Sequence, residues 1–249
     1  MLIDSHCHIL STEYDDVNKV IQEITKSNIL MIINGYDVSS SIEAVELAKK
    51  YKNVYASVGI GPENVDEITD TDIRKISDLL CNPKVVAIGE IGLDYYWTKE
   101  NKEKQIKVFK EMLALAKNSN LPVIVHSRDS IQDVFNLLNS YGVTGILHCY
   151  SGSLEMAKEF IKKGFLIGIG GVVTFKNAKK IKEVVKEIPL SSISIETDSP
   201  YLTPEPYRGK KNESTKLKYI VQEIASIKGV SLDEVESVTT SNVMSKFDL

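Results

Sequence analysis

The chain alternates between short runs of Val, Ile and Leu and longer stretches in which apolar residues recur every three or four positions. Such short apolar runs are typical of strands buried on both faces of a parallel sheet. The longer stretches have the spacing of amphipathic helices, as in Val17, Ile21 and Ile24. The apolar runs predict eight strands, at residues 2–6, 29–34, 54–59, 85–89, 122–126, 144–148, 165–170 and 192–197.

The spacing of these eight strands predicts how they are connected. Their starts lie about 27 residues apart on average, the length of one strand with its following helix. No Gly-, Ser- or Pro-rich linker interrupts the series, so we expect residues 1–249 to form one domain, a (β/α)8 TIM barrel. Residues 214–227 and 232–247 predict two further helices, and the second is an extra C-terminal helix that begins with the capping pair Ser231 and Glu234. The alternative is an open doubly wound sheet, with its site at one switch point.

Composition and charge exclude several classes of protein. The chain is 43% hydrophobic and 26% charged with a net charge of −4, which is typical of globular proteins and not of disordered ones. The slight acidity argues against a broad basic groove for nucleic acid, and no apolar run reaches the ~18 residues that span a bilayer. The start has no signal-peptide pattern, and three cysteines indicate a reducing compartment. We therefore expect a cytoplasmic protein without a membrane or an obligatory protein partner.

The only four histidines all fall at the ends of predicted strands. His6 and His8 end the first strand, and because side chains alternate along a strand, both face the same side. His126 ends the fifth strand and His148 ends the sixth. Barrel enzymes build their sites at this end of the strands, so the four imidazoles predict a metal site there.

Two carboxylates join the histidines at the same predicted edge. Glu90 follows the fourth strand, and Asp198 follows the eighth. A carboxylate that ends an apolar run would be costly to bury without a cation. Six ligands are too many for one catalytic zinc ion, which takes three protein ligands, but they fit two ions that share a carboxylate. Glu90 is the predicted bridge.

Seven motifs carry these residues along nearly the whole chain, and in this order they resemble the TatD family of metal-dependent deoxyribonucleases, which are amidohydrolase-like barrels. The resemblance implies an exonuclease-type hydrolase that acts on DNA, as single strands or strand ends. It also implies one ion on His6, His8, Glu90 and Asp198, and a second on Glu90, His126 and His148. The motifs are Asp4-Ser5-His6-Cys7-His8, Gly89-Glu90-Ile91-Gly92-Leu93-Asp94-Tyr95, His126-Ser127-Arg128, His148-Cys149-Tyr150-Ser151-Gly152, Glu196-Thr197-Asp198-Ser199-Pro200-Tyr201-Leu202, Arg208-Gly209-Lys210-Lys211-Asn212-Glu213 and Thr239-Thr240-Ser241-Asn242.

The chain departs from the family pattern at two places. After the third strand the family has Gly-x-His-Pro-His, whereas this chain has Gly61 and Glu63 in place of the two histidines. Any substrate contact of those histidines is therefore missing here, while the six inferred ligands remain. Ser214 stands where the family has a proline, a change expected to affect only the start of a helix.

The predicted reaction is metal-assisted phosphodiester hydrolysis, in which two divalent ions activate a water molecule and clamp the phosphate. Asp198 and Glu90 are the expected catalytic residues, with Asp198 as general base. Arg128 either forks onto a phosphate or interacts with Asp129 or with a helix end. Residues 205–218 carry a net charge of +3, and Arg208 in this segment is a further candidate phosphate contact.

Three aromatic residues follow Glu90 and have two interpretations. Tyr95, with Tyr96 and Trp97, either stacks on an unpaired base or forms a lid that packs on the barrel mouth. Cys7 and Cys149 adjoin inferred ligands, but their alternation phase predicts buried structural thiols. Gly89 and Gly92 flank Glu90 and predict a turn or a close approach of two backbones.

Two other functions compete with the nuclease. Phosphotriesterase- and lactonase-like barrels hydrolyse small molecules, but they bridge their metals with a modified lysine on strand four, where this chain has Glu90; its Lys84 precedes that strand. A non-catalytic metal or nucleic-acid binding protein would more often close its metal site with four ligands. The mixed imidazole and carboxylate ligands leave Mg, Mn and Zn open as the metal.

Overall fold

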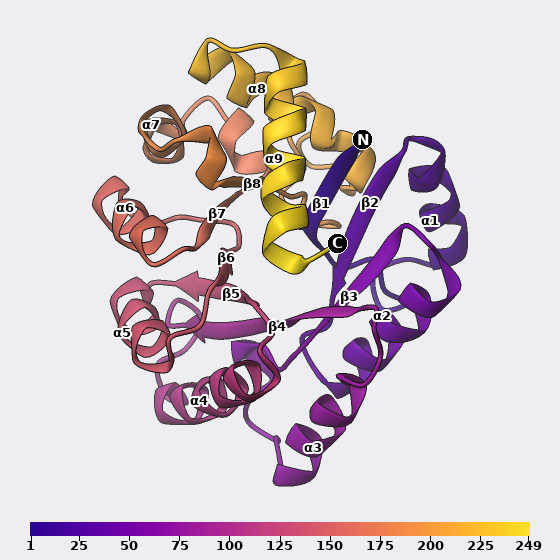
Figure 1. The fold of residues 1–249 in the computed structure, drawn as a ribbon, viewed down its shortest axis with the longest axis vertical. Coiled ribbons are helices and arrows are strands. Elements are labelled where there is room, and N and C mark those ends of the chain that lie inside the picture. Colours follow the sequence, from indigo (N-terminus) through magenta and orange to yellow (C-terminus); the bar gives the residue numbers. More distant parts are fainter.

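The computed structural model describes residues 1–249 and contains one sheet of eight parallel strands, paired in chain order from β1 to β8 (Figure 1). Two backbone hydrogen bonds join its ends: the Asp198 N–H donates to the His6 carbonyl (3.0 Å) and the His8 N–H to the Ser199 carbonyl (2.7 Å). The sheet therefore forms a nearly closed barrel ringed by helices. The predicted barrel is confirmed, and the open doubly wound sheet is excluded.

Each strand is followed in the chain by an α-helix, and after β3, β7 and β8 a short 3-10 turn precedes that helix. The strands are β1 (Leu2–Cys7), β2 (Ile29–Asn34), β3 (Val54–Val58), β4 (Val85–Asp94), β5 (Val123–Arg128), β6 (Gly145–Leu147), β7 (Leu166–Ile169) and β8 (Ile193–Ile195). The helices are α1 (Val17–Lys26), α2 (Val38–Lys50), α3 (Asp70–Leu79), α4 (Lys102–Ser119), α5 (Ile131–Tyr141), α6 (Leu154–Lys162), α7 (Lys179–Glu187), α8 (Leu217–Lys228) and α9 (Leu232–Phe247). Single 3-10 turns are η1 (Pro62–Asn64), η2 (Gly171–Thr174), η3 (Leu190–Ser192) and η4 (Ser214–Lys216). None of these helices has the length and apolar character needed to cross a membrane.

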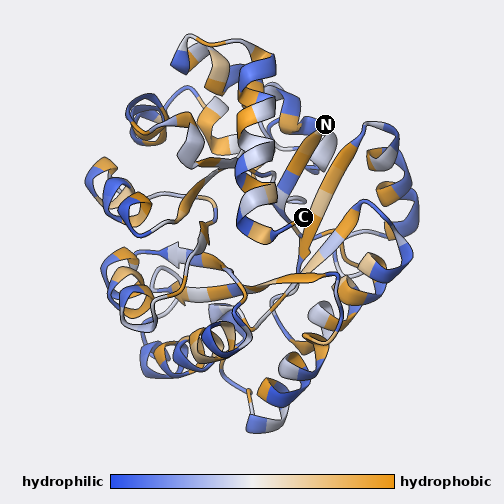
Figure 2. Ribbon diagram, viewed as in Figure 1, coloured by the Kyte–Doolittle hydropathy of each residue, from blue (hydrophilic) through white to orange (hydrophobic).

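Alternation along the strands divides the apolar side chains into two cores. In β2, Met31 and Ile33 belong to the large core between strands and helices, whereas Ile32 belongs to a smaller core inside the barrel. Figure 2 shows apolar strands surrounded by helices that carry both apolar and hydrophilic residues. The inner core is completed by Val243 and Phe247 of α9.

Helix α9 is the predicted extra C-terminal helix, and it closes the end of the barrel where the strands begin. Its Thr240 hydroxyl donates to the Met1 carbonyl, and its Asn242 amide donates to the carbonyls of Leu190 and Ile193, before and at the start of β8. At its own start the Ser231 side chain accepts the N–H of Glu234, as the capping prediction required. With this end blocked, the carboxyl ends of the strands remain as the face for a site.

One strand is substantially longer than predicted. The apolar run predicted a fourth strand that ends at Gly89, but β4 continues to Asp94, and all ten of its residues are buried. Its pairing with β5 shifts register between Ile88 and Ile91. Glu90 thus lies inside a strand, at an irregularity, and not after the strand end.

Candidate metal centre

The six predicted ligands come together at the carboxyl end of the barrel. Five strands carry these residues or precede them: β1 carries His6 and precedes His8, and β4 carries Glu90. Two more histidines come from β5 and from the residue after β6, and Asp198 follows β8. The six are His6, His8, Glu90, His126, His148 and Asp198, and they form three overlapping groups in each of which the candidate ligand atoms lie within 4.8 Å of one another.

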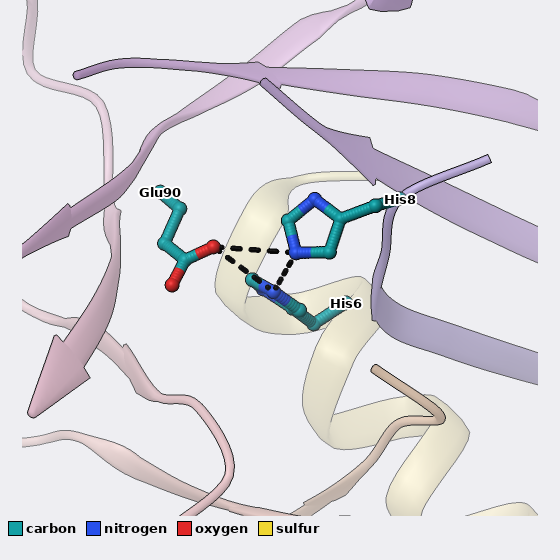
Figure 3. Close-up of side chains that lie close together, drawn as sticks. All are labelled: His6, His8 and Glu90. Atoms are coloured by element: carbon teal, nitrogen blue, oxygen red, sulfur yellow. Dashed lines mark hydrogen bonds and ion pairs between the residues drawn. The ribbon is translucent and has the colours of Figure 1, made fainter. Parts of the chain in front are cut away.

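The first half of the cluster lies around the Nε2 atoms of His6 and His8, which are 3.0 Å apart. Glu90 Oε2 lies 3.5 Å from the His6 nitrogen and 3.3 Å from the His8 nitrogen (Figure 3). Asp198 Oδ1 approaches the same two nitrogens at 3.5 and 3.6 Å. His8 is oriented by its other nitrogen, which lies 2.9 Å from the Asn34 carbonyl oxygen.

The second half lies on the other oxygen of Glu90. Glu90 Oε1 is 3.1 Å from His126 Nδ1 and 3.2 Å from His148 Nε2, and these two nitrogens are 3.2 Å apart. Each carboxylate oxygen of Glu90 therefore faces its own pair of imidazoles. This is the arrangement expected of a carboxylate shared between two sites.

The distances and the donor types fit bound cations. Atoms bound at 2.0–2.2 Å to one tetrahedral ion are about 3.3–3.6 Å apart, close to the spacings within each half. In both halves two imidazole nitrogens face each other, and such a pair needs either a shared proton or a cation between the lone pairs. The Nδ1 atom of His6 has no hydrogen-bond partner, so no contact on that side of the ring fixes its protonation.

The charge around the cluster also fits cations. Four carboxylates surround it, and histidine is the only cationic side chain within ion-pair distance of any of them. When all four are ionised, their negative charge matches that of two divalent cations, and burying it unpaired would be costly. These carboxylates are Glu90, Asp94, Glu196 and Asp198.

Without a metal, protons take the place of the cations. Burial alone would lower the pKa of His126, but the carboxylates of Asp94 and Glu90 outweigh it and raise this pKa to about 9. Burial raises the pKa of Glu90, but the neighbouring histidines, above all His148, hold it well below its usual range. Burial and the charge of His148 lower the pKa of His6. Without a metal, Glu90 is therefore ionised beside a protonated His126, whereas His6 is neutral, and cation binding must displace the proton of His126.

Asp198 differs from Glu90 in its ionisation. Burial raises its pKa to about 6, and His148 and His8 offset only part of this effect. Its backbone is in the left-handed region, with φ of 55°. The turn that presents it is fixed by Asn212, a buried residue whose side-chain amide donates to the carbonyls of Thr197 and Tyr201. This role of Asn212 was not predicted from the sequence.

Two carboxylates behind the histidines were also not predicted as part of the site. Asp94 Oδ2 lies 2.9 Å from His126 Nε2, and Asp94 is 2% exposed. Glu196 Oε1 lies 3.5 Å from His148 Nδ1 and accepts the N–H of Cys149. Metal-binding histidines commonly donate their second N–H to such a carboxylate. The sequence did indicate these two residues, because Asp94 and Glu196 lie in the two motifs that also contain Glu90 and Asp198.

The predicted substrate contacts lie in different environments. Arg128 is half-buried at the end of β5, and its guanidinium lies 3.6 Å from the centre of the Tyr96 ring, so the alternative pairing with Asp129 is not formed. Tyr95 is 7% exposed and donates its hydroxyl to Asp133, so the structure does not offer it as a stacking surface. Arg208 is exposed and lies 4.3 Å from the Phe175 ring centre.

The remaining predictions near the cluster concern thiols and glycines. Cys7 is buried as expected, but Cys149 is half-buried, because its backbone turns at φ of 43° to direct its N–H to Glu196. Gly92 confirms the close approach of backbones: a Cβ there would lie 2.0 Å from the His126 carbonyl oxygen. Gly61 stands where the family has the first of its two histidines. A Cβ at this position would lie 3.9 Å from the Glu90 carbonyl oxygen, so the position borders the cluster.

Comparisons with known proteins agree with the site. The family model described as "TatD related DNase" matches residues 3–248. The chain is 44% identical to the uncharacterized metal-dependent hydrolase YabD of Bacillus subtilis over 99% of both chains, and 33% identical to the uncharacterized metal-dependent hydrolase YcfH of Escherichia coli over 100% of this chain and 96% of that one. The crystal structure of YJJV, a TatD homolog from Escherichia coli, superposes with a TM-score of 0.93 at 28% identity, covering 100% of this chain and 98% of the other. The chain therefore belongs to the TatD-related DNase family of metal-dependent hydrolases.

Proposed function

We propose that this chain is a divalent-metal-dependent deoxyribonuclease of the exonuclease type, acting as one unit over residues 1–249. The observation that carries the proposal is the position of Glu90, whose two carboxylate oxygens each face a pair of histidines. The family description and the likeness to a TatD homolog support DNA as the substrate. The free cysteines fit a reducing, cytoplasmic setting.

The proposed ligands divide into two sets that share Glu90. When bound, two divalent cations would polarise the phosphate and lower the pKa of a water molecule, and Mg, Mn and Zn are all compatible with the donors. His6, His8 and Glu90 would hold one cation together with Asp198, whose Oδ1 approaches both histidines, and Glu90, His126 and His148 would hold the other.

The side chains of the chain itself would orient the substrate and move the proton. Asp198 would accept the proton of the attacking water, because its raised pKa of about 6 makes it a stronger base than an ordinary aspartate while leaving it ionised at neutral pH. Arg128 would bind a phosphate oxygen, since no carboxylate occupies its guanidinium. Arg208 would add a second contact from the basic segment after β8.

A small-molecule phosphoester hydrolase is the second candidate. A phosphotriesterase homology protein from Escherichia coli with phosphate in its active site shares the fold, with a TM-score of 0.68 at 16% identity. The Lys84 ammonium, however, donates to the carbonyls of Lys52 and Val54 before and at the start of β3, so it is remote from the cluster. A purely binding role is disfavoured, because Glu90, His126 and Asp198 keep 12%, 21% and 14% of their side chains exposed and open to a substrate.

The test is a cleavage assay with the purified protein. End-labelled single-stranded DNA, RNA of the same sequence and a generic phosphodiester would each be incubated with Mg, Mn or Zn, and with a chelator. We expect metal-dependent cleavage of DNA that is lost in His126→Ala and kept in Lys162→Ala, an exposed change on α6. Absence of DNA cleavage under every metal would contradict the proposal, and cleavage of the generic ester alone would favour the second candidate.

A further inference from the structure

Two large aromatic side chains stand exposed next to the metal cluster. Tyr96 is 55% exposed and Trp97 is 66% exposed, and both follow directly after β4, which carries Glu90. Their rings meet edge to face, with centres 5.1 Å apart. Exposed apolar surface of this kind commonly marks a binding surface, and these two rings, unlike the buried ring of Tyr95, are largely uncovered. Trp97 is the only tryptophan of the chain.

A free cation lies against the same rings. Arg128 projects from the end of β5, two residues after His126, and pairs in register with Asp94 of β4. Its guanidinium carbon lies 3.6 Å from the Tyr96 ring centre and 5.2 Å from that of Trp97. Stacking on Tyr96 holds the guanidinium in place while its N–H groups remain free for an anion.

The segment that carries the aromatic rings is held in one conformation. Asp94 Oδ1 accepts the backbone N–H groups of Tyr96 (2.9 Å) and Trp97 (3.4 Å). The buried Gln105 side chain bonds to both the N–H and the carbonyl of Asp94. Beneath them, Tyr95 is anchored to Asp133. A surface ordered before binding loses little entropy when a ligand arrives.

We propose that Trp97, Tyr96 and Arg128 form a nucleotide subsite beside the metal centre, in which an unpaired base stacks on Trp97 and Arg128 binds the adjoining phosphate. The assignment rests on the proposed nuclease function and names the residues that recognise its substrate. A ring face accepts any unstacked base, whereas a paired base inside a duplex is already covered on both faces. His126 lies on the same face of β5 as Arg128, at about 6.6 Å along the strand, so a phosphate on Arg128 is a close neighbour of one at the metal centre.

The single tryptophan allows a binding test that needs no catalysis. The wild-type protein, kept in chelator so that DNA stays intact, would be titrated with a short single-stranded oligodeoxynucleotide while tryptophan fluorescence is followed. A matched oligonucleotide of the same length with abasic sugars throughout has the same charge and no bases. We expect quenching by the first oligonucleotide and not by the second. Equal quenching by both, or quenching by neither, would overturn the assignment.

Variants separate stacking from charge. Replacing Trp97→Ala should weaken binding of a dye-labelled oligonucleotide, measured by anisotropy, by about 5- to 100-fold, whereas Trp97→Phe, which keeps a ring face, should restore most of the affinity. Neither change should alter the affinity for the abasic strand. An equal loss for both strands would overturn base stacking.

The cleavage assay distinguishes this inference from the proposed function. Base-dependent quenching without cleavage under any metal would refute the nuclease and leave the subsite in place. Metal-dependent cleavage of DNA without base-dependent quenching would refute the subsite and leave the nuclease in place.

Discussion

The outer carboxylate Asp94 offers a direct test of how the second half of the metal centre is built. Its Oδ2 lies 2.9 Å from His126 Nε2, while its Oδ1 accepts the N–H groups of Tyr96 and Trp97. In Asp94→Asn one oxygen becomes an NH2 group. The amide can serve the two backbone donors or accept from His126, but it cannot do both.

The expected loss follows from this geometry. If the amide oxygen keeps accepting the N–H groups of Tyr96 and Trp97, the NH2 group faces His126 Nε2. His126 then cannot donate its Nε2–H to this side chain. The ring loses the partner that holds Nδ1 toward Glu90. A hydrogen bond to a charged group contributes about 1.5–3 kcal/mol. Loss of such a partner commonly lowers metal affinity by about 10- to 100-fold, or about 1.4–2.7 kcal/mol. The two ranges agree, so we expect a loss of about this size at one of the two metal steps.

Isothermal titration of the chelator-treated protein with Mn or Zn measures this loss. The affected step is identified by comparison with His126→Ala, which should remove it. Asp133→Asn is the matched control: Asp133 binds Tyr95 and Lys102 on the same side of the barrel but touches no histidine, so both metal steps should be retained. Unchanged affinity at both steps in Asp94→Asn, or equal weakening of both in a folded protein, would refute the reasoning.

Three further outcomes follow from the structure. At saturating metal, Asp198→Asn should lower kcat by about 10²–10⁴-fold, as expected for a lost general base, and a near-normal rate would exclude that role. Phe160→Ala should cost about 3–5 kcal/mol in urea unfolding because the ring is fully buried between two other rings, whereas exposed Lys162→Ala should change stability by less than about 0.5 kcal/mol. In chelator, the contribution of His126 to stability should be complete below the ordinary histidine pKa of 6.5 and be lost as pH rises toward 9, because folding raises this pKa. The Tm of the metal-free protein should therefore fall over this range more steeply than that of His126→Gln, and an equal or shallower slope would contradict the assignment.

The barrel was predictable because its signal is repeated. Every strand contains a short apolar run, and the helical stretches between them have buried residues at spacings of three and four, such as Val17, Ile21 and Ile24 of α1. Errors at single boundaries do not change such a series. The extra helix was predictable for a different reason, since Ser231 forms a local cap that depends on few other residues.

The six central residues of the cluster were predictable because each stands at or near the end of an apolar run. Because the carboxyl ends of all strands meet at one end of a barrel, these residues could be placed together before any distance was known. Arg128 and Tyr95 had no comparable constraint: ring stacking on Tyr96 and the bond to Asp133 depend on side-chain packing between β4, β5 and α5. Tyr95 is buried and Tyr96 is exposed. Two adjacent tyrosines in a sequence do not show which of them is buried.

Asp94 was missed because the fourth strand was ended too early, and the reason lies in Gly92. A glycine close after an apolar run is compatible with a turn, but here its missing side chain lets β4 continue against the His126 carbonyl. Had the strand been extended, alternation would have set Glu90 and Asp94, four residues apart, on the same face. Gly92 therefore allows β4 to supply both Glu90, between the two histidine pairs, and Asp94, which orients His126. The role of this glycine depends on its contact with β5, and the sequence of β4 alone does not show that contact.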